Sequence, residues 1–161
     1  MRLQKNTELA LYSVLEFAGQ PDRHISAAEI ADKYGVSPHH LAKVLAQLTR
    51  SGIVTSVRGA GGGYRFTGNA RRLTLLDIIE MFEELAPPPA AHHDKPGAST
   101  PVERALGAVL SEIDANAKAT FSSITQATML RMIERQKTGA EAAAPPVQTE
   151  PPTPSPHSKP P

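Results

Sequence analysis

Two capped helical segments joined by a short turn that contains a glycine constrain the fold of this chain more than any other feature. Ser26 followed by Glu29 is a capping-box pattern, which predicts the start of one helix. Gly35 suits the left-handed conformation in which a helix ends and the chain turns. Ser37 and Pro38 are favoured at the N-cap and first position of a second helix. Together these segments predict a helix-turn-helix.

A β-rich stretch follows the second helix, which is expected to end near Ser51. Ile53–Val57 and Tyr64–Thr67 are two short runs of strand-forming residues, and Arg58–Gly63 lies between them. Four of the five residues after Arg58 are glycine. Two such runs joined by a glycine-rich loop predict a hairpin. Directly after a helix-turn-helix, this hairpin is expected to be a wing.

Further helices are predicted on both sides of this unit. An apolar stripe of Leu11, Val14, Leu15 and Ala18 predicts a helix over residues 7–18. Capping patterns at Thr74 and Thr100 start two more helices, of which the second is long, and a short helix is expected after it. The fold class is therefore mainly α with a small β-hairpin wing: a winged helix-turn-helix followed by a long C-terminal dimerisation helix.

The expected organisation has four parts. Residues 1–84 form the winged helix-turn-helix domain, and 85–99 form a proline-rich loop. Residues 100–137 form the dimerisation region. Residues 138–161 hold eight prolines among 24 residues and almost no large apolar side chains, so this tail is expected to be disordered. No signal peptide or membrane-spanning run is found, and a soluble, cytoplasmic protein is expected.

Charge is distributed unevenly along the chain. The net charge is only +1, but residues 1–72 contain ten Lys and Arg against five Asp and Glu. Residues 73–161 contain seven against eleven. A basic N-terminal half on a nearly neutral chain is typical of a protein with one face directed to nucleic acid.

The second helix of the helix-turn-helix carries polar side chains opposite its leucines. The outward positions are His39, His40, Lys43, Gln47 and Arg50. Glutamine can pair with adenine edges, and lysine or arginine with guanine or phosphate. These residues predict a recognition helix, although an ordinary solvated helix face would carry similar side chains.

The glycine-rich loop strengthens the DNA hypothesis. Glycines allow backbone amides to approach phosphates, and they allow a loop tip to carry Arg58 into a narrow minor groove. A nucleotide-binding loop would need a following helix and a Lys-Ser/Thr pair, whereas a strand follows here.

These segments resemble the bacterial IscR/NsrR family of transcriptional regulators (the Rrf-two family). The resemblance covers about residues 1–135 and is most specific at Val57–Arg65. It implies a homodimer that inserts two recognition helices and two wings into a pseudo-palindromic operator in double-stranded DNA. It also implies that Arg2, Lys5 and Thr7 lie near phosphates. The complete predicted DNA-contacting set is Arg2, Lys5, Thr7, Ser37, His39, His40, Lys43, Gln47, Arg50, Arg58, Gly59, Gly61, Gly62, Gly63 and Tyr64.

The chain departs from that family at the position of its sensor loop. Cluster-binding members carry three cysteines there, and this sequence contains no cysteine at all. An iron–sulfur cluster held by cysteines is therefore excluded, and no cofactor is expected. His92, His93 and Asp94 suggest a metal or haem site, but a solvated polar patch in a proline-rich loop is the favoured explanation.

The long helix carries an apolar stripe of Val102, Leu106, Val109 and Ile113. Dimerisation or internal packing would explain it, and a dimer is favoured because two half-sites provide the affinity that one small domain lacks.

No catalytic constellation is present, so an enzyme is not expected. The hypothesis is a cluster-free repressor that blocks polymerase by occupying its operator. The alternatives are a winged-helix module that binds protein, or a regulator with a histidine-ligated metal or haem. The operator, target genes and effector are not specified.

Overall fold

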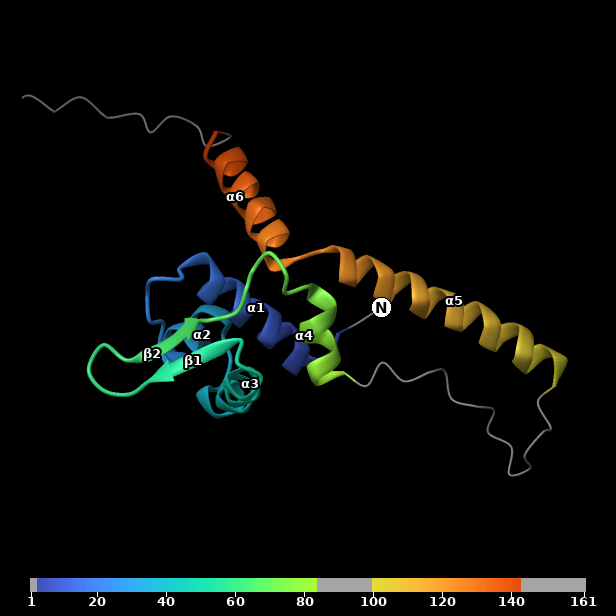
Figure 1. Ribbon diagram of the computed structural model, residues 1–161, viewed down its shortest axis with the longest axis horizontal. Coiled ribbons are helices and arrows are strands. Elements are labelled where there is room, and N and C mark those ends of the chain that lie inside the picture. The colour runs from blue at the N-terminus through green and yellow to red at the C-terminus, as the bar shows by residue number, and fades with distance from the viewer. Residues whose placement is uncertain (1–2, 84–99, 143–161) are drawn as a thin grey trace, which may run out of the picture.

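The computed structural model describes residues 3–83 and 100–142. Within these ranges the elements are α1 (Lys5–Gly19), α2 (Ala27–Tyr34), α3 (Pro38–Arg50), β1 (Val54–Val57), β2 (Gly63–Phe66), α4 (Leu75–Phe82), α5 (Pro101–Ser123) and α6 (Gln126–Ala142). As Figure 1 shows, α1 to α4 and the hairpin form a compact body, from which α5 projects. The predicted fold class is confirmed: a helical protein with a two-stranded antiparallel wing.

The core lies around α1, which packs against α3, α4 and α6. Its fully or almost fully buried side chains include Leu9, Val14 and Phe17 of α1, Ile30 of α2, Leu41, Val44, Leu45 and Leu48 of α3, and Ile78 of α4. Each such side chain contributes about 1.5–3 kcal/mol of burial free energy. The buried face of α1 differs from the predicted stripe, because Leu11 and Leu15 are only half-buried. A helix surrounded by three others buries more than one stripe.

The helix starts follow the local sequence closely. Glu29 and Ser26 form both bonds of a capping box, with N···O distances of 2.8 and 3.2 Å. Thr74 and Thr100 start α4 and α5 through the same reciprocal contacts with the third helical residue. Gly35 has φ 61°, the left-handed conformation predicted for the turn. Ser37 occupies the N-cap of α3, but its hydroxyl makes no capping hydrogen bond.

The wing has a third, short segment at its base. Strand pairing aligns Val54 with Phe66 and Val57 with Gly63. Ile25, in the α1–α2 loop, forms an antiparallel bridge to Tyr64: its N–H donates to the Tyr64 carbonyl at 3.0 Å and its carbonyl accepts from the Tyr64 N–H at 2.8 Å. The wing is therefore attached to the body by backbone hydrogen bonds.

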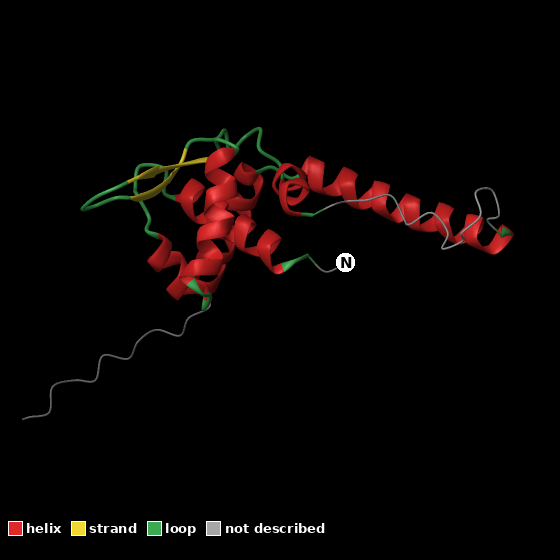
Figure 2. Ribbon diagram, turned by 90° about the horizontal axis from the view of Figure 1, so that it is seen from below, coloured by secondary structure: helices red, strands yellow, loops and turns green. Residues whose placement is uncertain are grey.

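The C-terminal helices differ from the prediction in length. The long helix, α5, ends at Ser123, and α6 has 17 residues instead of being short. α6 also passes Lys137, where the folded part was expected to end. The predicted loop (85–99) and the remainder of the predicted tail (143–161) lie outside the described residues. Figure 2 shows α5 as an arm extending from the body. Among the described helices, none combines the length and apolar character needed to span a bilayer.

Candidate nucleic-acid interface

The outward face of α3 carries the side chains predicted for a recognition helix. His39, Lys43 and Arg50 are exposed, while Gln47 is half-buried. The guanidinium of Arg50 donates a 2.6 Å hydrogen bond to Oε1 of Gln47, so these two side chains are held side by side. The opposite face of α3 is anchored in the core through its leucines and Val44. The helix is thus fixed on one side and polar on the other.

His40 and Ser37 contribute differently to this face. His40 is half-buried, and its Nε2 atom is buried without a hydrogen-bond partner in the described part of the chain. That ring nitrogen is therefore turned toward the protein. Ser37 is exposed, and since it makes no capping bond its hydroxyl is available at the N-terminal end of the helix.

The wing tip requires glycine at several positions. Gly59 and Gly61 have φ values of 106° and 76°, which side chains rarely adopt. A Cβ atom on Gly62 would lie 2.3 Å from the Val57 carbonyl oxygen, because the Gly62 N–H donates to the Gly59 carbonyl across a tight turn. A Cβ atom on Gly63 would lie 2.7 Å from the Ile25 carbonyl oxygen. The glycines therefore shape the tip and its attachment to the body.

Arg58 is the cationic side chain at this tip. It is exposed, and no hydrogen bond or ion pair engages it within residues 3–83 and 100–142. Tyr64 behaves differently, since its half-buried ring lies against Phe17 with a centroid distance of 6.0 Å. Arg58 is free to reach a ligand, whereas Tyr64 supports the base of the wing.

The three N-terminal residues expected to lie near phosphates differ in where the structure places them. Lys5 is exposed in the first turn of α1, and Arg2 lies outside the described residues. Thr7 is completely buried and its hydroxyl has no partner among the described residues, so its side chain cannot reach DNA in this conformation. The backbone N–H of Gln4 donates to Oε1 of Glu83 at 2.8 Å. The start of α1 is therefore attached to the end of α4.

A pocket of about 260 Å³ lies beside the recognition helix and was not predicted from the sequence. Lys43, Val44 and Gln47 of α3 line it together with Asn6 of α1 and Met81 and Phe82 of α4. Asn6 is exposed and belongs to the same surface as Lys43. No sequence pattern indicates this grouping, because three separate helices supply the lining.

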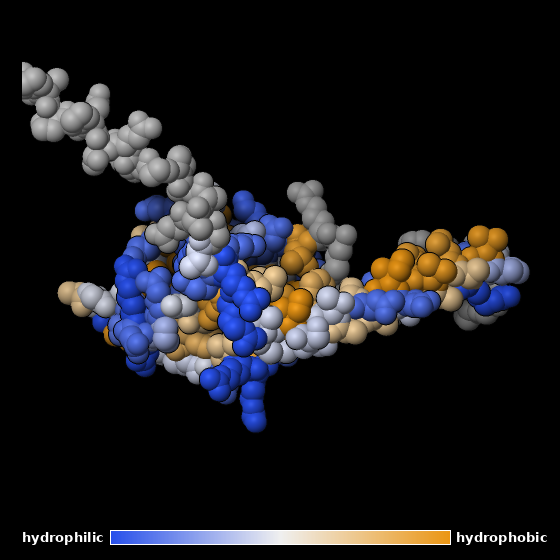
Figure 3. Space-filling model, turned by 90° about the horizontal axis from the view of Figure 1, so that it is seen from above, coloured by the Kyte–Doolittle hydropathy of each residue, from blue (hydrophilic) through white to orange (hydrophobic). Residues whose placement is uncertain are grey.

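An apolar surface remains uncovered on α5. The four residues of the predicted stripe are more than half exposed, at 75% for Val102, 58% for Leu106, 55% for Val109 and 57% for Ile113. Leu110, which is not part of the predicted stripe, belongs to the same surface and is 42% exposed. α5 contains no buried residue. Figure 3 shows apolar surface gathered on the projecting arm.

One carboxylate of α1 links this helix to α2. Glu16 of α1 has its side chain only 18% exposed, and its Oε1 atom lies 2.5 Å from Nζ of Lys33 and accepts a 2.6 Å hydrogen bond from the Tyr34 hydroxyl. Burial alone would raise the pKa of Glu16, but Lys33, Tyr34 and the more distant Lys137 outweigh burial and lower it. Burial and Glu16 together raise the pKa of Tyr34. This contact joins α1 to α2, the first helix of the helix-turn-helix.

The described residues do not offer a metal site. No group of three or more His, Cys, Asp or Glu side chains capable of holding a metal ion is found among them. The sequence contains no cysteine. His92, His93 and Asp94 lie outside the described residues.

A helix-turn-helix with an exposed polar recognition face, followed by a glycine-tipped wing, defines a DNA-binding regulator of the winged-helix class. Residues 3–132 match the Rrf2 family, described as iron-dependent transcriptional regulators. The chain belongs to this family and is a transcriptional regulator. The resemblance predicted from the sequence is therefore confirmed. Iron bound through a cysteine-ligated cluster does not fit this chain, because it has no cysteine ligands.

Individual relatives agree with this assignment. The chain is 51% identical over 142 residues to a protein of Rhodopseudomonas palustris named as the HTH-type transcriptional regulator BadM, covering 86% of this chain and 88% of the relative. Among solved structures it is similar to CymR, the global cysteine regulator of B. subtilis, with 25% identity and a TM-score of 0.67 over 82% of this chain and 98% of that one. IscR of T. potens has 25% identity and a TM-score of 0.66 over 90% of this chain and 93% of its own.

Proposed function

We propose that this regulator represses transcription by binding a pseudo-palindromic operator as a homodimer, without an iron–sulfur cluster. The observation that carries the proposal is the combination of Arg58, exposed and unpaired among the described residues, with a glycine tip that accepts no side chain at Gly62. A narrow minor groove has enhanced negative potential and favours an inserted arginine. A wing of this shape is suited to that contact.

The recognition helix is proposed to read bases in the major groove. Lys43, Gln47 and Arg50 lie on its outward face, where lysine and arginine can pair with guanine and glutamine with adenine. His39 and Ser37 are exposed at the N-terminal end of the same helix, the end that contacts bases in helix-turn-helix proteins. Lys5 and Asn6, at the start of α1, are placed to contact the phosphates beside the groove.

Dimerisation is proposed to occur through α5. An arm without buried residues, carrying five exposed large apolar side chains, is unfavourable in water unless another surface covers it. A second copy of the chain is the proposed cover, because two recognition helices and two wings then address two half-sites. Binding both half-sites gives the dimer an affinity for DNA that a single small domain cannot reach.

Repression is the proposed direction of regulation, because a dimer that covers an operator blocks polymerase by occupancy alone. The cysteine-free sequence supports regulation without a cysteine-ligated cluster.

The test is the affinity of the purified protein for duplex DNA at two salt concentrations. The probe is a duplex enriched by the protein from genomic fragments, with a scrambled duplex of equal length as reference. Selective binding that weakens steeply with salt, and weakens further in Arg58→Ala, is expected. The matched control is Arg131→Ala, which removes the same charge from an exposed position on α6.

An absence of selective binding at low salt would overturn the proposal. In that case a winged-helix module that binds another protein becomes the better hypothesis. Selective binding that appears only after addition of Zn²⁺, Fe²⁺ or haem would instead favour a histidine-ligated sensor, and His92→Ala/His93→Ala would then abolish the response.

A further inference from the structure

The loop between α1 and α2 carries the segment to which the wing is attached. Ile25 lies in this loop, is 3% exposed, and commits both its backbone N–H and its carbonyl to Tyr64 of β2. The close approach leaves no space for a side chain on Gly63, whose Cβ would lie 2.7 Å from the Ile25 carbonyl oxygen. The orientation of the hairpin relative to the body therefore depends on where the loop holds Ile25.

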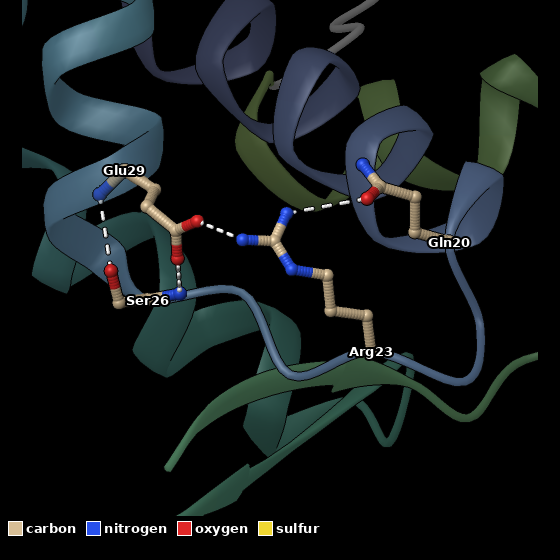
Figure 4. Close-up of polar contacts among 4 residues, drawn as sticks. All are labelled: Gln20, Arg23, Ser26 and Glu29. Atoms are coloured by element: carbon tan, nitrogen blue, oxygen red, sulfur yellow. Dashed lines mark hydrogen bonds and ion pairs between the residues drawn. The ribbon is translucent and has the colours of Figure 1, made fainter. Parts of the chain in front are cut away.

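The Arg23 side chain connects the two ends of this loop. Its guanidinium donates a 3.3 Å hydrogen bond to Oε1 of Gln20, the residue that caps the end of α1. It also donates to Oε1 of Glu29 in the first turn of α2, forming an ion pair. Figure 4 shows the guanidinium between Gln20 and Glu29, with the hairpin strands on the other side of the loop.

Glu29 is held in place for this contact by the start of its own helix. Its second oxygen, Oε2, accepts a 2.8 Å hydrogen bond from the Ser26 N–H. The hydrogen bonds with Ser26 and the charge of Arg23 lower the pKa of Glu29, so the carboxylate is ionised at neutral pH. Ser26 directly follows Ile25, so the capping box and the ion pair restrain the loop next to the residue that holds the wing.

We propose that Arg23 is a positioning residue for the wing, acting through Glu29 and Ile25 and not through contact with DNA. By joining Gln20 to Glu29, it fixes the loop on which the Ile25–Tyr64 bridge depends, and so it sets the orientation in which the tip presents Arg58. This inference rests on the proposed DNA-binding function. Glu29 has the same positioning role, although its negative charge, considered alone, opposes DNA binding.

Two substitutions separate this role from the effect of charge. Glu29→Gln retains a residue suited to the capping box but removes the ion pair, and it makes the chain more positive by one charge. Long-range attraction to phosphate predicts tighter DNA binding for this variant, whereas loss of wing positioning predicts binding weaker by about two- to fivefold. Arg23→Lys keeps the charge, but a lysine cannot reproduce the planar fork that reaches two partners, so a similar weakening is expected.

The experiment measures affinity for a duplex enriched by the unchanged protein from a randomised pool. Glu134→Gln is the matched control, since it adds the same charge and removes the 3.6 Å ion pair with Lys137 on α6. Its affinity is expected to equal or slightly exceed that of the unchanged protein. Tighter binding by Glu29→Gln, or undiminished binding by Arg23→Lys, would overturn the proposal.

A double-mutant cycle with Arg58 distinguishes wing positioning from general destabilisation. If Arg23 and Glu29 act through the tip, Glu29→Gln costs little further affinity once Arg58→Ala is present. A loss of the same size in both backgrounds would show that the loop does not act through Arg58.

Amide hydrogen exchange of the free protein provides a readout that needs no DNA. Exchange of the Ile25 and Tyr64 amides is expected to accelerate in Glu29→Gln and Arg23→Lys, while that of the core helix α4 stays unchanged. Unchanged exchange at Ile25 and Tyr64 would overturn the positioning role. If the unchanged protein enriched no duplex, the proposed DNA-binding function would fall, and the exchange rates would still decide what Arg23 does.

Discussion

The hydroxyl of Tyr34 donates a 2.6 Å hydrogen bond to Oε1 of Glu16, which ties the end of α2 to the last turn of α1. The Tyr34 ring also stacks on Tyr12, with centroids 4.8 Å apart and planes inclined by 10°. α2 is only eight residues long and buries two of them. A short helix with so little buried surface depends on such contacts for its position.

Tyr34→Phe tests the value of this hydrogen bond, because phenylalanine retains the stacking on Tyr12. The free energy of unfolding is expected to fall by about 1 kcal/mol, the usual contribution of one such bond. Glu16→Gln, which also weakens the contact with Lys33, is expected to cost about 1–2 kcal/mol. Chemical denaturation of both variants measures these differences. Equal stability of Tyr34→Phe and the unchanged protein would contradict the prediction.

The acid sensitivity of folding should depend on Glu16. Its pKa is lower in the folded chain than its ordinary value of 4.5, so its ionised form stabilises the fold. That stabilisation is complete above the unfolded pKa and is lost as the pH falls through the folded pKa. The stability difference between the unchanged protein and Glu16→Gln should therefore be largest near neutral pH and shrink below about pH 4. A difference independent of pH would exclude this role.

Gly62→Ala should damage the wing without damaging the core. The added Cβ atom would lie 2.3 Å from the Val57 carbonyl oxygen, so the tip must rearrange. The melting temperature is expected to change little, because the tip buries no core residue, while DNA affinity falls by about tenfold. Ala60→Gly is the control in the same loop and should bind DNA almost normally. Normal affinity in Gly62→Ala would mean that the shape of the tip is not needed.

Charges on the apolar stripe of α5 should separate the proposed dimer. Leu106→Glu with Val109→Glu places two carboxylates in the surface that is expected to be covered, where burying them is costly. Light scattering is expected to report a monomer, and operator affinity should collapse because only one half-site is then engaged. Ser111→Glu adds a charge on the opposite side of α5 and should leave the dimer intact. A dimer that survived the double substitution would place the interface elsewhere.

The sequence predicted the helix starts correctly, because they depend on residues close together in the chain. Capping boxes at Ser26, Thr74 and Thr100 depend on residues three positions apart, so their patterns identified the helix starts correctly. Contacts between segments far apart in the chain have no such pattern in the sequence. The Ile25–Tyr64 bridge uses only backbone atoms, and any pair of residues could form it.

The positions where the structure differs from the expectation have the same origin. Thr7 is polar and close to Lys5, but the packing of α1 against α4 and α3 turns it into the core. The break between α5 and α6 falls at Ile124–Thr125, where Thr125 pairs with Thr74 and no glycine or proline marks the site. In both cases tertiary contacts, which single-residue propensities do not contain, decided the outcome.

Because α5 buries none of its residues, the stability of this helix is expected to depend on the concentration of the protein. A helix of 23 residues that buries none of them gains little stability from tertiary packing, which is the main source of helix stability in proteins. If a second copy supplies the cover, folding of α5 and association are one equilibrium, and both follow mass action. At low abundance the arms would be unpaired, frayed and open to proteolysis; at higher abundance they would be ordered and protected. The regulator would then act with a threshold in its own copy number, before any effector is considered.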